Sequence, residues 1–355
     1  MLKENCNMTN RMIDDDFLED LQSDGILSPV VDLVKEKNLI LSFRDNYINV
    51  YHNSHSIYKI VQKKMPGQKY RVEFDFNHAR YTKSYVTDLE ELKSLGFKLS
   101  NNTDNVAFDY YESGKCKSGN NKIYTYISDL DDQFWMNSSN ILIALVNDFF
   151  SNNGKDYFCG EVIKGQRKNN KNRFLEKKRQ QDIALANRNA DNPFFIYDIE
   201  YAEPNGKKKG VPGRFDMSGV YTEKRMVKKL FLIELKSTIY ACKGETSGII
   251  SHENDMEKYL ADNKALIERK EEAVAILEGY NTLFNGNSKL TFPNNPQDID
   301  VGAFFILTDE AITQKHMIRK FNSIMLENDR WEITYELCES ILNEKKDFVD
   351  ADNNL

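Results

Sequence analysis

The amino-acid sequence predicts an α+β protein of two domains, a β-rich N-terminal domain (residues 1–134) and an α/β domain (residues 135–355). The chain has 355 residues, which is enough for two domains at roughly 100–200 residues each. Hydrophobic residues make up 40% and aromatic residues 12% of the chain, so it can bury a core and is not disordered throughout. Near Trp135 the apolar pattern changes from short alternating runs to longer helical ones.

Alternation of apolar with polar residues predicts antiparallel strands in the first domain. The alternating runs are residues 39–43, 48–50, 57–61 and 70–77. This period of two is typical of an antiparallel sheet with one face in water. We expect a helix over residues 88–95, which ends at Gly96, and a loop over residues 101–121.

The second domain is expected to contain a central mixed sheet flanked by helices. Helix-like segments cover residues 139–150, 172–189, 249–260 and 263–283, and another closes the chain. Strand-like runs cover residues 194–202, 214–221, 230–236 and 301–309. The order of these segments favours helices on both sides of one sheet.

Composition excludes several classes of protein. The five cysteines are scattered and form no CxxC pair, so a zinc ribbon, a thioredoxin site and a four-cysteine iron–sulfur cluster all lack ligands. The N-terminus has no apolar signal core, and the longest apolar run, Ile141 to Val146, is too short to span a bilayer. The expectation is a cytoplasmic protein with no membrane partner.

Two neighbouring strands carry the residues with the clearest chemistry. Asp216 lies near the start of one strand, and Glu234 and Lys236 lie two residues apart on the next, so these two share a face. If the strands pair, Asp216 can approach Glu234, and two adjacent carboxylates repel unless a cation lies between them. Carboxylate oxygens suit Mg²⁺, which binds substrate phosphate as well. The pattern predicts metal-assisted phosphodiester hydrolysis.

The strand context distinguishes this triplet from another copy of it. Glu91-Leu92-Lys93 has the same three residue types but lies in the helical segment DLEELKSLG, with no strand before it. This pattern resembles the motif of the PD-(D/E)XK nuclease superfamily: Asp216 is followed eighteen residues later by Glu234, and then by Lys236. The resemblance covers the C-terminal half to three-fifths of the chain, and Phe215 stands where the family name has proline.

The resemblance implies a restriction-endonuclease-like core with Asp216 and Glu234 as ligands of Mg²⁺ or Mn²⁺. Lys236 would then position the attacking water or stabilise charge on the phosphate. The family often adds a glutamate from the preceding helix, and Glu176 occupies that place, on one helical face with Gln180. Glu200, on the strand of residues 194–202 with Asp198, is the competing third carboxylate.

The helix after the motif supplies further candidates. His252, Asp255 and Tyr259 share one face at spacings of three and four residues. In several branches of the family a glutamine and then a tyrosine lie near the phosphates on this helix. Here His252 or Asp255 would replace the glutamine, and Tyr259 would be the tyrosine.

Charge is distributed unevenly around the proposed site. The formal net charge is −7, but residues 161–179 carry a local +6 and residues 201–229 a local +5, which leaves −18 elsewhere. Phosphate contacts dominate nucleic-acid affinity, so these segments are where we expect binding. The candidate nucleic-acid contacts are Lys168, Lys171, Arg173, Lys178, Lys208, Arg214, His252 and Tyr259.

The expected function is that of a metal-dependent nuclease, with DNA favoured over RNA as the substrate. Such nucleases are similar to bacterial restriction and defence proteins or to mobile-element proteins, and cutting both strands would suggest a homodimer. The alternative is a catalytically inactive nuclease fold that binds nucleic acid or a partner. The N-terminal domain has no interpretable motif.

Overall fold

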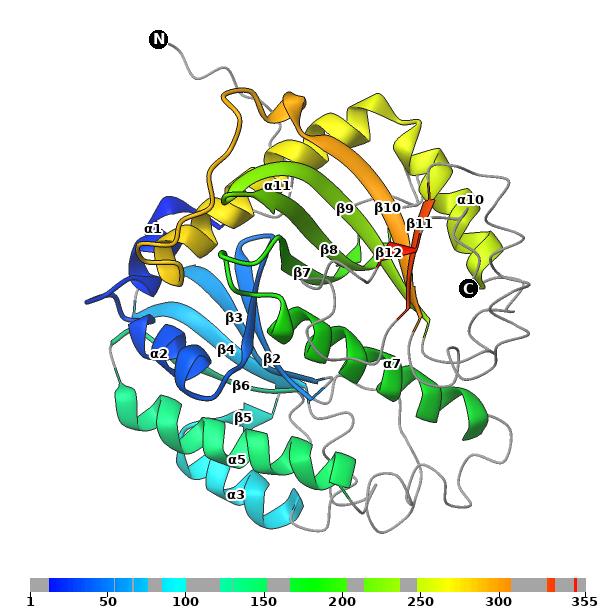
Figure 1. Cartoon of the computed structure of the whole chain (residues 1–355). Helices are drawn as coiled ribbons and strands as arrows, with labels where there is room; N and C mark the ends of the chain where they lie inside the picture. The colour runs from blue at the N-terminus through cyan, green and yellow to red at the C-terminus, as the bar shows by residue number, and fades with distance from the viewer. Residues whose placement is uncertain are drawn as a thin grey trace. The chain divides into compact units, whose positions relative to one another are not determined.

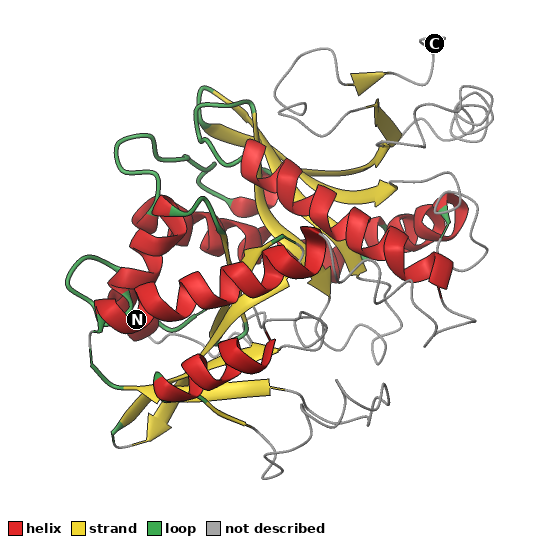
Figure 2. Cartoon of the chain, turned by 90° about the horizontal axis from the view of Figure 1, so that it is seen from below, coloured by secondary structure: helices red, strands yellow, loops and turns green. Residues whose placement is uncertain are grey.

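Two β-sheets organise the chain, and each belongs to its own compact unit. The computed structural model describes residues 13–53, 55–65, 67–75, 85–99, 122–129, 131–151, 167–202, 214–236, 248–307, 331–335 and 348–349. The first unit covers residues 13–177, and the second contains the chain from residue 178 onward. Helices accompany strands in both units, which confirms the predicted mixed α+β class (Figures 1 and 2).

The first unit is built on an antiparallel sheet with the strand order β1-β2-β3-β4-β6-β5 among the described residues. Every strand pair in this order is antiparallel. Its elements are α1 (Asp15–Leu21), α2 (Ser28–Glu36), β1 (Ile40–Arg44), β2 (Tyr47–His52), β3 (His55–Met65), β4 (Gln68–Asp75), α3 (Tyr85–Ser94), β5 (Lys98–Leu99), β6 (Lys122–Ile127) and α5 (Asp132–Ser151).

Two buried tyrosines tie helices to this sheet. The Tyr58 hydroxyl on β3 hydrogen-bonds the Ser138 hydroxyl on α5 at 2.5 Å, and the Tyr58 ring packs edge-on against Trp135. Burial raises the pKa of Tyr58. On β4, the Tyr70 ring contacts Phe17 of α1, so α1 and α5 both pack on the sheet.

The division into units differs from the predicted domain boundary at residue 134. It falls between Lys177 and Lys178, inside α7 (Arg167–Ala186), so α5 belongs to the first unit. The physical reason is the apolar face of α5, where Trp135 and Leu142 are buried. A boundary inferred from a change in periodicity cannot tell which sheet a helix will cover.

The second unit contains a mixed sheet with the order β12-β11-β10-β9-β8-β7. Strand β10 runs parallel to both β9 and β11, and the remaining neighbours are antiparallel. Besides α7, its elements are β7 (Phe194–Ala202), β8 (Arg214–Glu223), β9 (Met226–Lys236), α10 (Ile249–Leu260), α11 (Asn263–Leu283), the short 3-10 helix η3 (Pro296–Asp298), β10 (Asp300–Leu307), β11 (Trp331–Tyr335) and β12 (Phe348–Val349).

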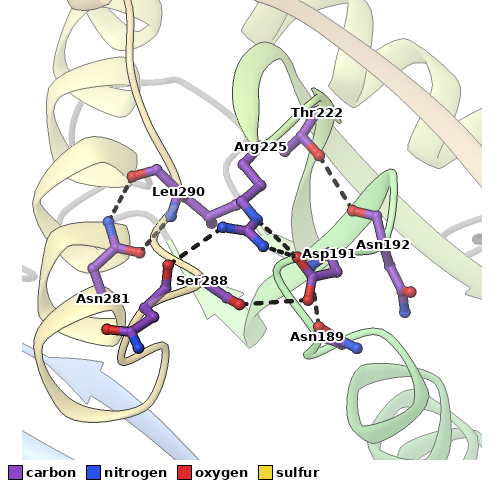
Figure 3. A network of polar contacts seen from close by, with 9 residues as sticks. Asn189, Asp191, Asn192, Thr222, Arg225, Asn281, Ser288 and Leu290 are labelled. Carbon is purple, nitrogen blue, oxygen red and sulfur yellow. Dashed lines mark hydrogen bonds and ion pairs between the residues drawn. The ribbon is translucent and has the colours of Figure 1, made fainter.

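The β8–β9 hairpin is held at its turn by a polar network (Figure 3). Lys224 and Arg225 form the two-residue turn, and both have positive φ, as a type I′ turn requires. Arg225 Nη2 lies 2.6 Å from Asp191 Oδ1, while its backbone carbonyl accepts from the Thr291 N–H at 2.8 Å. The buried Asn281 side chain bonds both the N–H and the carbonyl of Leu290, at 2.7 and 2.8 Å.

A buried ionic contact lies between α11 and β8. Arg269, which is 1% exposed, pairs with Glu272 one helical turn later and donates from Nη2 to the Ser218 hydroxyl at 2.6 Å. Around it, Leu232, Met256 and Tyr259 belong to one hydrophobic cluster between the sheet, α10 and α11. The helices are thereby fixed on the strands that carry the predicted site.

Across the described part of the chain, no helix combines the length and the apolar character that crossing a bilayer requires.

Candidate functional site

Strand pairing brings Asp216 and Glu234 to adjacent positions. Met217 of β8 pairs with Ile233 of β9 in antiparallel register, so the residues on either side of this pair, Asp216 and Glu234, come opposite each other. Strong β-formers surround Glu234, and the strand positions from Leu230 to Lys236 are all buried. The predicted strand-to-strand approach of the two carboxylates is therefore present.

Asp216 is oriented by two N–H donors. Its Oδ2 accepts from the backbone N–H of Leu235 at 2.8 Å, and its Oδ1 accepts from Nε2 of Gln180 at 2.7 Å. Gln180 lies on α7, so a helix and a neighbouring strand both contribute to the position of this carboxylate. An ionised carboxylate only accepts hydrogen bonds, and these two donors match that form.

Glu234 is a buried carboxylate between two basic side chains. It is 2% exposed, and Lys236, two residues later on β9, is 3% exposed. Lys236 Nζ lies 3.2 Å from Glu234 Oε2, and His252 Nδ1 on α10 lies 3.3 Å from Oε1. The paired positions 234 and 236 share a strand face, as their spacing predicts.

The neighbours of Glu234 keep it ionised despite its burial. Burial alone would raise its pKa, but the hydrogen bond from His252 and the charge of Lys236 outweigh that effect and hold the pKa below its ordinary value. A hydrogen bond with the Asp216 carboxyl lowers it further. Two carboxyl groups in such contact repel when both are ionised, unless a cation lies between them.

The donor set fits a hard divalent cation. Carboxylate oxygens from Asp216 and Glu234 are the ligands Mg²⁺ and Mn²⁺ prefer. The side chain that bonds Asp216 adds a further oxygen: Gln180 Oε1 is buried and has no hydrogen-bond partner within the described segments, so it could accept from water bound to a cation. Within the ranges that the structure describes, no set of three or more His, Cys, Asp or Glu side chains is grouped as a ready-made metal site.

The candidates for a third carboxylate lie on α7 and β7. Glu176 is half-buried on α7, one turn before Gln180, and it is Gln180 that hydrogen-bonds Asp216. Glu200 is half-buried on β7 with a positive φ of 53°. Asp198 is 1% exposed, and its Oδ1 accepts from the following backbone N–H at 2.9 Å.

The candidate nucleic-acid contacts have different environments. His252 has a side chain 24% exposed and lies against Glu234, while Arg214 is exposed at the start of β8. Lys178 is partly exposed and pairs with Asp182 at 2.7 Å. Tyr259 is fully buried, and its ring packs edge-on against Phe215 in the hydrophobic cluster. The Tyr259 side chain therefore packs in the core and does not reach the surface.

Four of the basic candidates have no described side chain. Lys168, Lys171 and Arg173 lie on the first turns of α7, where only the backbone is described. Lys208 lies outside the described residues.

Sequence reasoning missed the role of Gln180. The spacing of four residues already placed Gln180 on the same helical face as Glu176, so the signal was present. Glu176 was named because the family resemblance implies a glutamate on this helix. The structure shows that Gln180, one turn later, hydrogen-bonds Asp216, and Glu176 stays a prediction.

Comparisons of the chain with protein-family models, with curated proteins and with solved structures each found no match.

Proposed function

We propose that this protein is a divalent-metal-dependent nuclease with a restriction-endonuclease-like core, which hydrolyses phosphodiester bonds in DNA. One observation carries the proposal. Asp216, Glu234 and Lys236 meet on paired strands, with Glu234 and Lys236 buried almost completely. Charged side chains are seldom buried unless they are paired, and such clusters concentrate at functional sites.

The carboxylates of Asp216 and Glu234 would hold Mg²⁺ or Mn²⁺. When bound, such an ion supplies a Lewis acid for the phosphoryl oxygen and lowers the pKa of bound water. The protein's own side chains and backbone would hold the two carboxylates in place. Leu235 N–H and Gln180 Nε2 fix Asp216, and His252 and Lys236 fix Glu234.

Lys236 has a second role in this proposal. Its ammonium group carries three N–H donors, one of which is directed to Glu234 Oε2. In a buried site a fixed positive charge stabilises negative charge that develops on phosphate far better than it would in water. Lys236 would also orient the attacking water by donating a hydrogen bond to it.

DNA is the proposed substrate because of the charge distribution. The segments 161–179 and 201–229 carry +6 and +5 and adjoin α7 and β8 in the sequence, the two elements that supply Gln180 and Asp216. Positive segments around an acidic centre attract a polyphosphate backbone. A role in restriction, defence or mobile-element biology belongs to the same proposal.

The test is cleavage of plasmid DNA, single-stranded DNA and RNA by the purified full-length chain in Mg²⁺ or Mn²⁺. We expect cleavage of DNA that EDTA abolishes, and a loss of about 10²–10³ in rate for Lys236→Ala, the usual effect of removing one electrostatic stabiliser. Lys93→Ala is the matched control, because it alters the same Glu-Leu-Lys triplet on helix α3 and should leave the rate unchanged.

Cleavage that persists in EDTA, or that is as fast in Lys236→Ala as in Lys93→Ala, would overturn the site assignment. DNA binding without cleavage, by a chain whose circular dichroism shows it to be folded, would favour the alternative of an inactive nuclease fold. Preferential cleavage of RNA would overturn the substrate.

A further inference from the structure

One buried oxygen of the site has no hydrogen-bond partner among the described residues. Gln180 is 3% exposed, its Nε2 donates to Asp216, and its Oε1 is inaccessible to solvent and receives no hydrogen bond. The great majority of buried side-chain polar atoms in proteins are paired, so an unpaired one indicates a missing water, ion or ligand.

The orientation of the Gln180 amide follows from its partner. Asp216 Oδ1 can only accept a hydrogen bond when the carboxylate is ionised, so the NH₂ group must face it and the carbonyl oxygen must face away from it. Both atoms are bonded to the same carbon. Gln180 Oε1 therefore belongs to the amide group that contacts Asp216, and it is directed away from that carboxylate.

The group that would satisfy this oxygen must be a donor or a cation. The site already contains the carboxylates of Asp216 and Glu234, so an added anion would be repelled. Mg²⁺ and Mn²⁺ keep several water ligands when bound by one or two carboxylates, and each of those waters is a strong hydrogen-bond donor. A neutral amide oxygen, on the side chain that contacts one of these carboxylates, suits such a water.

We infer that Gln180 is a positioning residue of the metal centre, with its Nε2 holding Asp216 and its Oε1 accepting a hydrogen bond from water bound to the ion. This inference rests on the proposed function, since it requires the Asp216–Glu234 pair to bind a divalent ion. It assigns to an amide on α7 the place for which sequence reasoning had chosen the carboxylate of Glu176.

The experiment is calorimetric titration of Mn²⁺ into the EDTA-treated full-length protein. The helix offers a matched control, because Gln181 is the same residue type, is also buried at 5% exposure, and follows Gln180 directly. Four variants are compared with the unaltered chain: Gln180→Met, Gln180→Glu, Gln181→Met and Gln181→Glu. The unfolding temperature of each variant without metal reports any purely structural effect.

We expect Gln180→Met to raise the Kd for Mn²⁺ about 10–100-fold, which is the usual effect of losing a partner of a metal ligand. We expect Gln180→Glu to lower the Kd, because it places a third negative charge beside Asp216 that only a cation relieves. Both Gln181 variants should bind Mn²⁺ as the unaltered chain does.

The outcomes separate this inference from the proposed function. If the unaltered chain binds no Mn²⁺, the proposed metal centre itself fails. If it binds Mn²⁺ and the Gln180→Met Kd equals that of Gln181→Met, the inference is overturned while the metal centre stands. If Gln180→Met does not fold, Gln180→Glu decides, and a Kd no lower than that of Gln181→Glu overturns the inference.

Discussion

Glu234 and Lys236 form an ion pair that is almost entirely shielded from water. Each is at most 3% exposed, and their charged atoms are 3.2 Å apart. Transfer of two charges out of water is so unfavourable that replacing such a pair with apolar residues is often neutral or stabilising. Removing only one partner is different, because it leaves the other charge buried without compensation.

Lys236→Met is therefore expected to lower the free energy of unfolding by about 3–5 kcal/mol at pH 7. The double variant Glu234→Leu/Lys236→Met should recover most of that loss, because neither charge of the pair remains. Urea unfolding measures both. Lys93→Met, which removes an exposed pairing with Glu90, should change the stability by less than about 1 kcal/mol. Equal losses at positions 236 and 93 would contradict the argument.

Glu234 should also make stability depend on pH. Because its folded-state pKa lies below the unfolded-state value of about 4.3, its stabilising contribution is complete above that pH and is lost as the pH falls through the folded-state pKa. Lys236, His252 and Asp216 are the charged or titratable groups that face it. The difference in unfolding free energy between the unaltered chain and Glu234→Gln, measured from pH 7 to pH 3, should shrink with acidification. A difference that stays constant from pH 7 to pH 3 would contradict the prediction that Glu234 makes the stability depend on pH.

Among the residues of the site, the sequence correctly predicted the positions that depend on the two-residue period of the strands. Asp216, Glu234 and Lys236 follow from a period of two and from one hairpin, and their approach is confirmed. The partner from α7 could not be chosen, because a helix presents residues four apart on one face and its axial position depends on tertiary packing. Here that position is set where the Ile196 N–H bonds the Asn187 carbonyl, just after α7.

The β8–β9 hairpin depends on contacts of unequal strength (Figure 3). The Arg225–Asp191 pair has side chains 40% and 51% exposed, and exposed ion pairs contribute about 0–1 kcal/mol. Asn281 is buried and bonds both backbone groups of Leu290, which would otherwise be unpaired away from water. The buried amide should therefore hold the segment before β10 more strongly than the ion pair does.

Asn281→Ala is expected to lower the free energy of unfolding by about 1–3 kcal/mol, because it leaves buried donors and acceptors unsatisfied. Asp191→Ala should lower it by less than about 1 kcal/mol. Thermal or urea unfolding of both variants compares them, with Asn287→Ala as an exposed control on the same loop. If Asp191→Ala were the more harmful, the ranking of the two contacts would be wrong.

Among elements, long periodic segments were predicted best. The helices α10 and α11 and the strand β7 have the predicted bounds, whereas α5 begins at Asp132, before the predicted residue 139. The short helices α1 and α2 were not predicted, because seven to nine residues contain too few repeats to reveal a helical period. The six-residue strand β6 was not predicted either. The described residues near the C-terminus form β11 and β12 where a helix-like segment was expected. The predicted loop over residues 101–121 lies outside the described residues.

For the whole molecule, the uneven charge predicts a strong salt dependence of DNA binding. Replacing Lys207, Lys208 and Lys209 with glutamine should reduce the slope of log K against log salt concentration by up to about 3, at about 0.9 per phosphate contact. Fluorescence anisotropy with labelled DNA measures the slope. Lys35→Gln/Lys37→Gln alters exposed lysines at the C-terminal end of α2 and should leave the slope unchanged. Equal slopes for the two sets of variants would show that the basic segment does not contact DNA.

For the whole molecule, the α+β class could be predicted from the sequence, but the boundary between the two units could not. Composition and periodicity predicted two sheets with helices, an antiparallel one first and a mixed one second, and these are present. The assignment of α5 required knowing which sheet its apolar face would cover. That information lies in contacts between residues far apart in the chain, such as Tyr58 with Ser138, and not in local pattern.

The buried contact of Arg269 with Ser218 bears on how faithfully the chain folds. Ser218 lies two residues after Asp216, so both side chains point to the same face of β8. A slip of one residue would place Met217 or Gly219 opposite the guanidinium and would turn Asp216 away from Glu234. Neither of those residues can replace the hydroxyl acceptor. The Arg269–Ser218 hydrogen bond and the approach of Asp216 to Glu234 therefore depend on the same register of β8, so a shift of one residue would remove both.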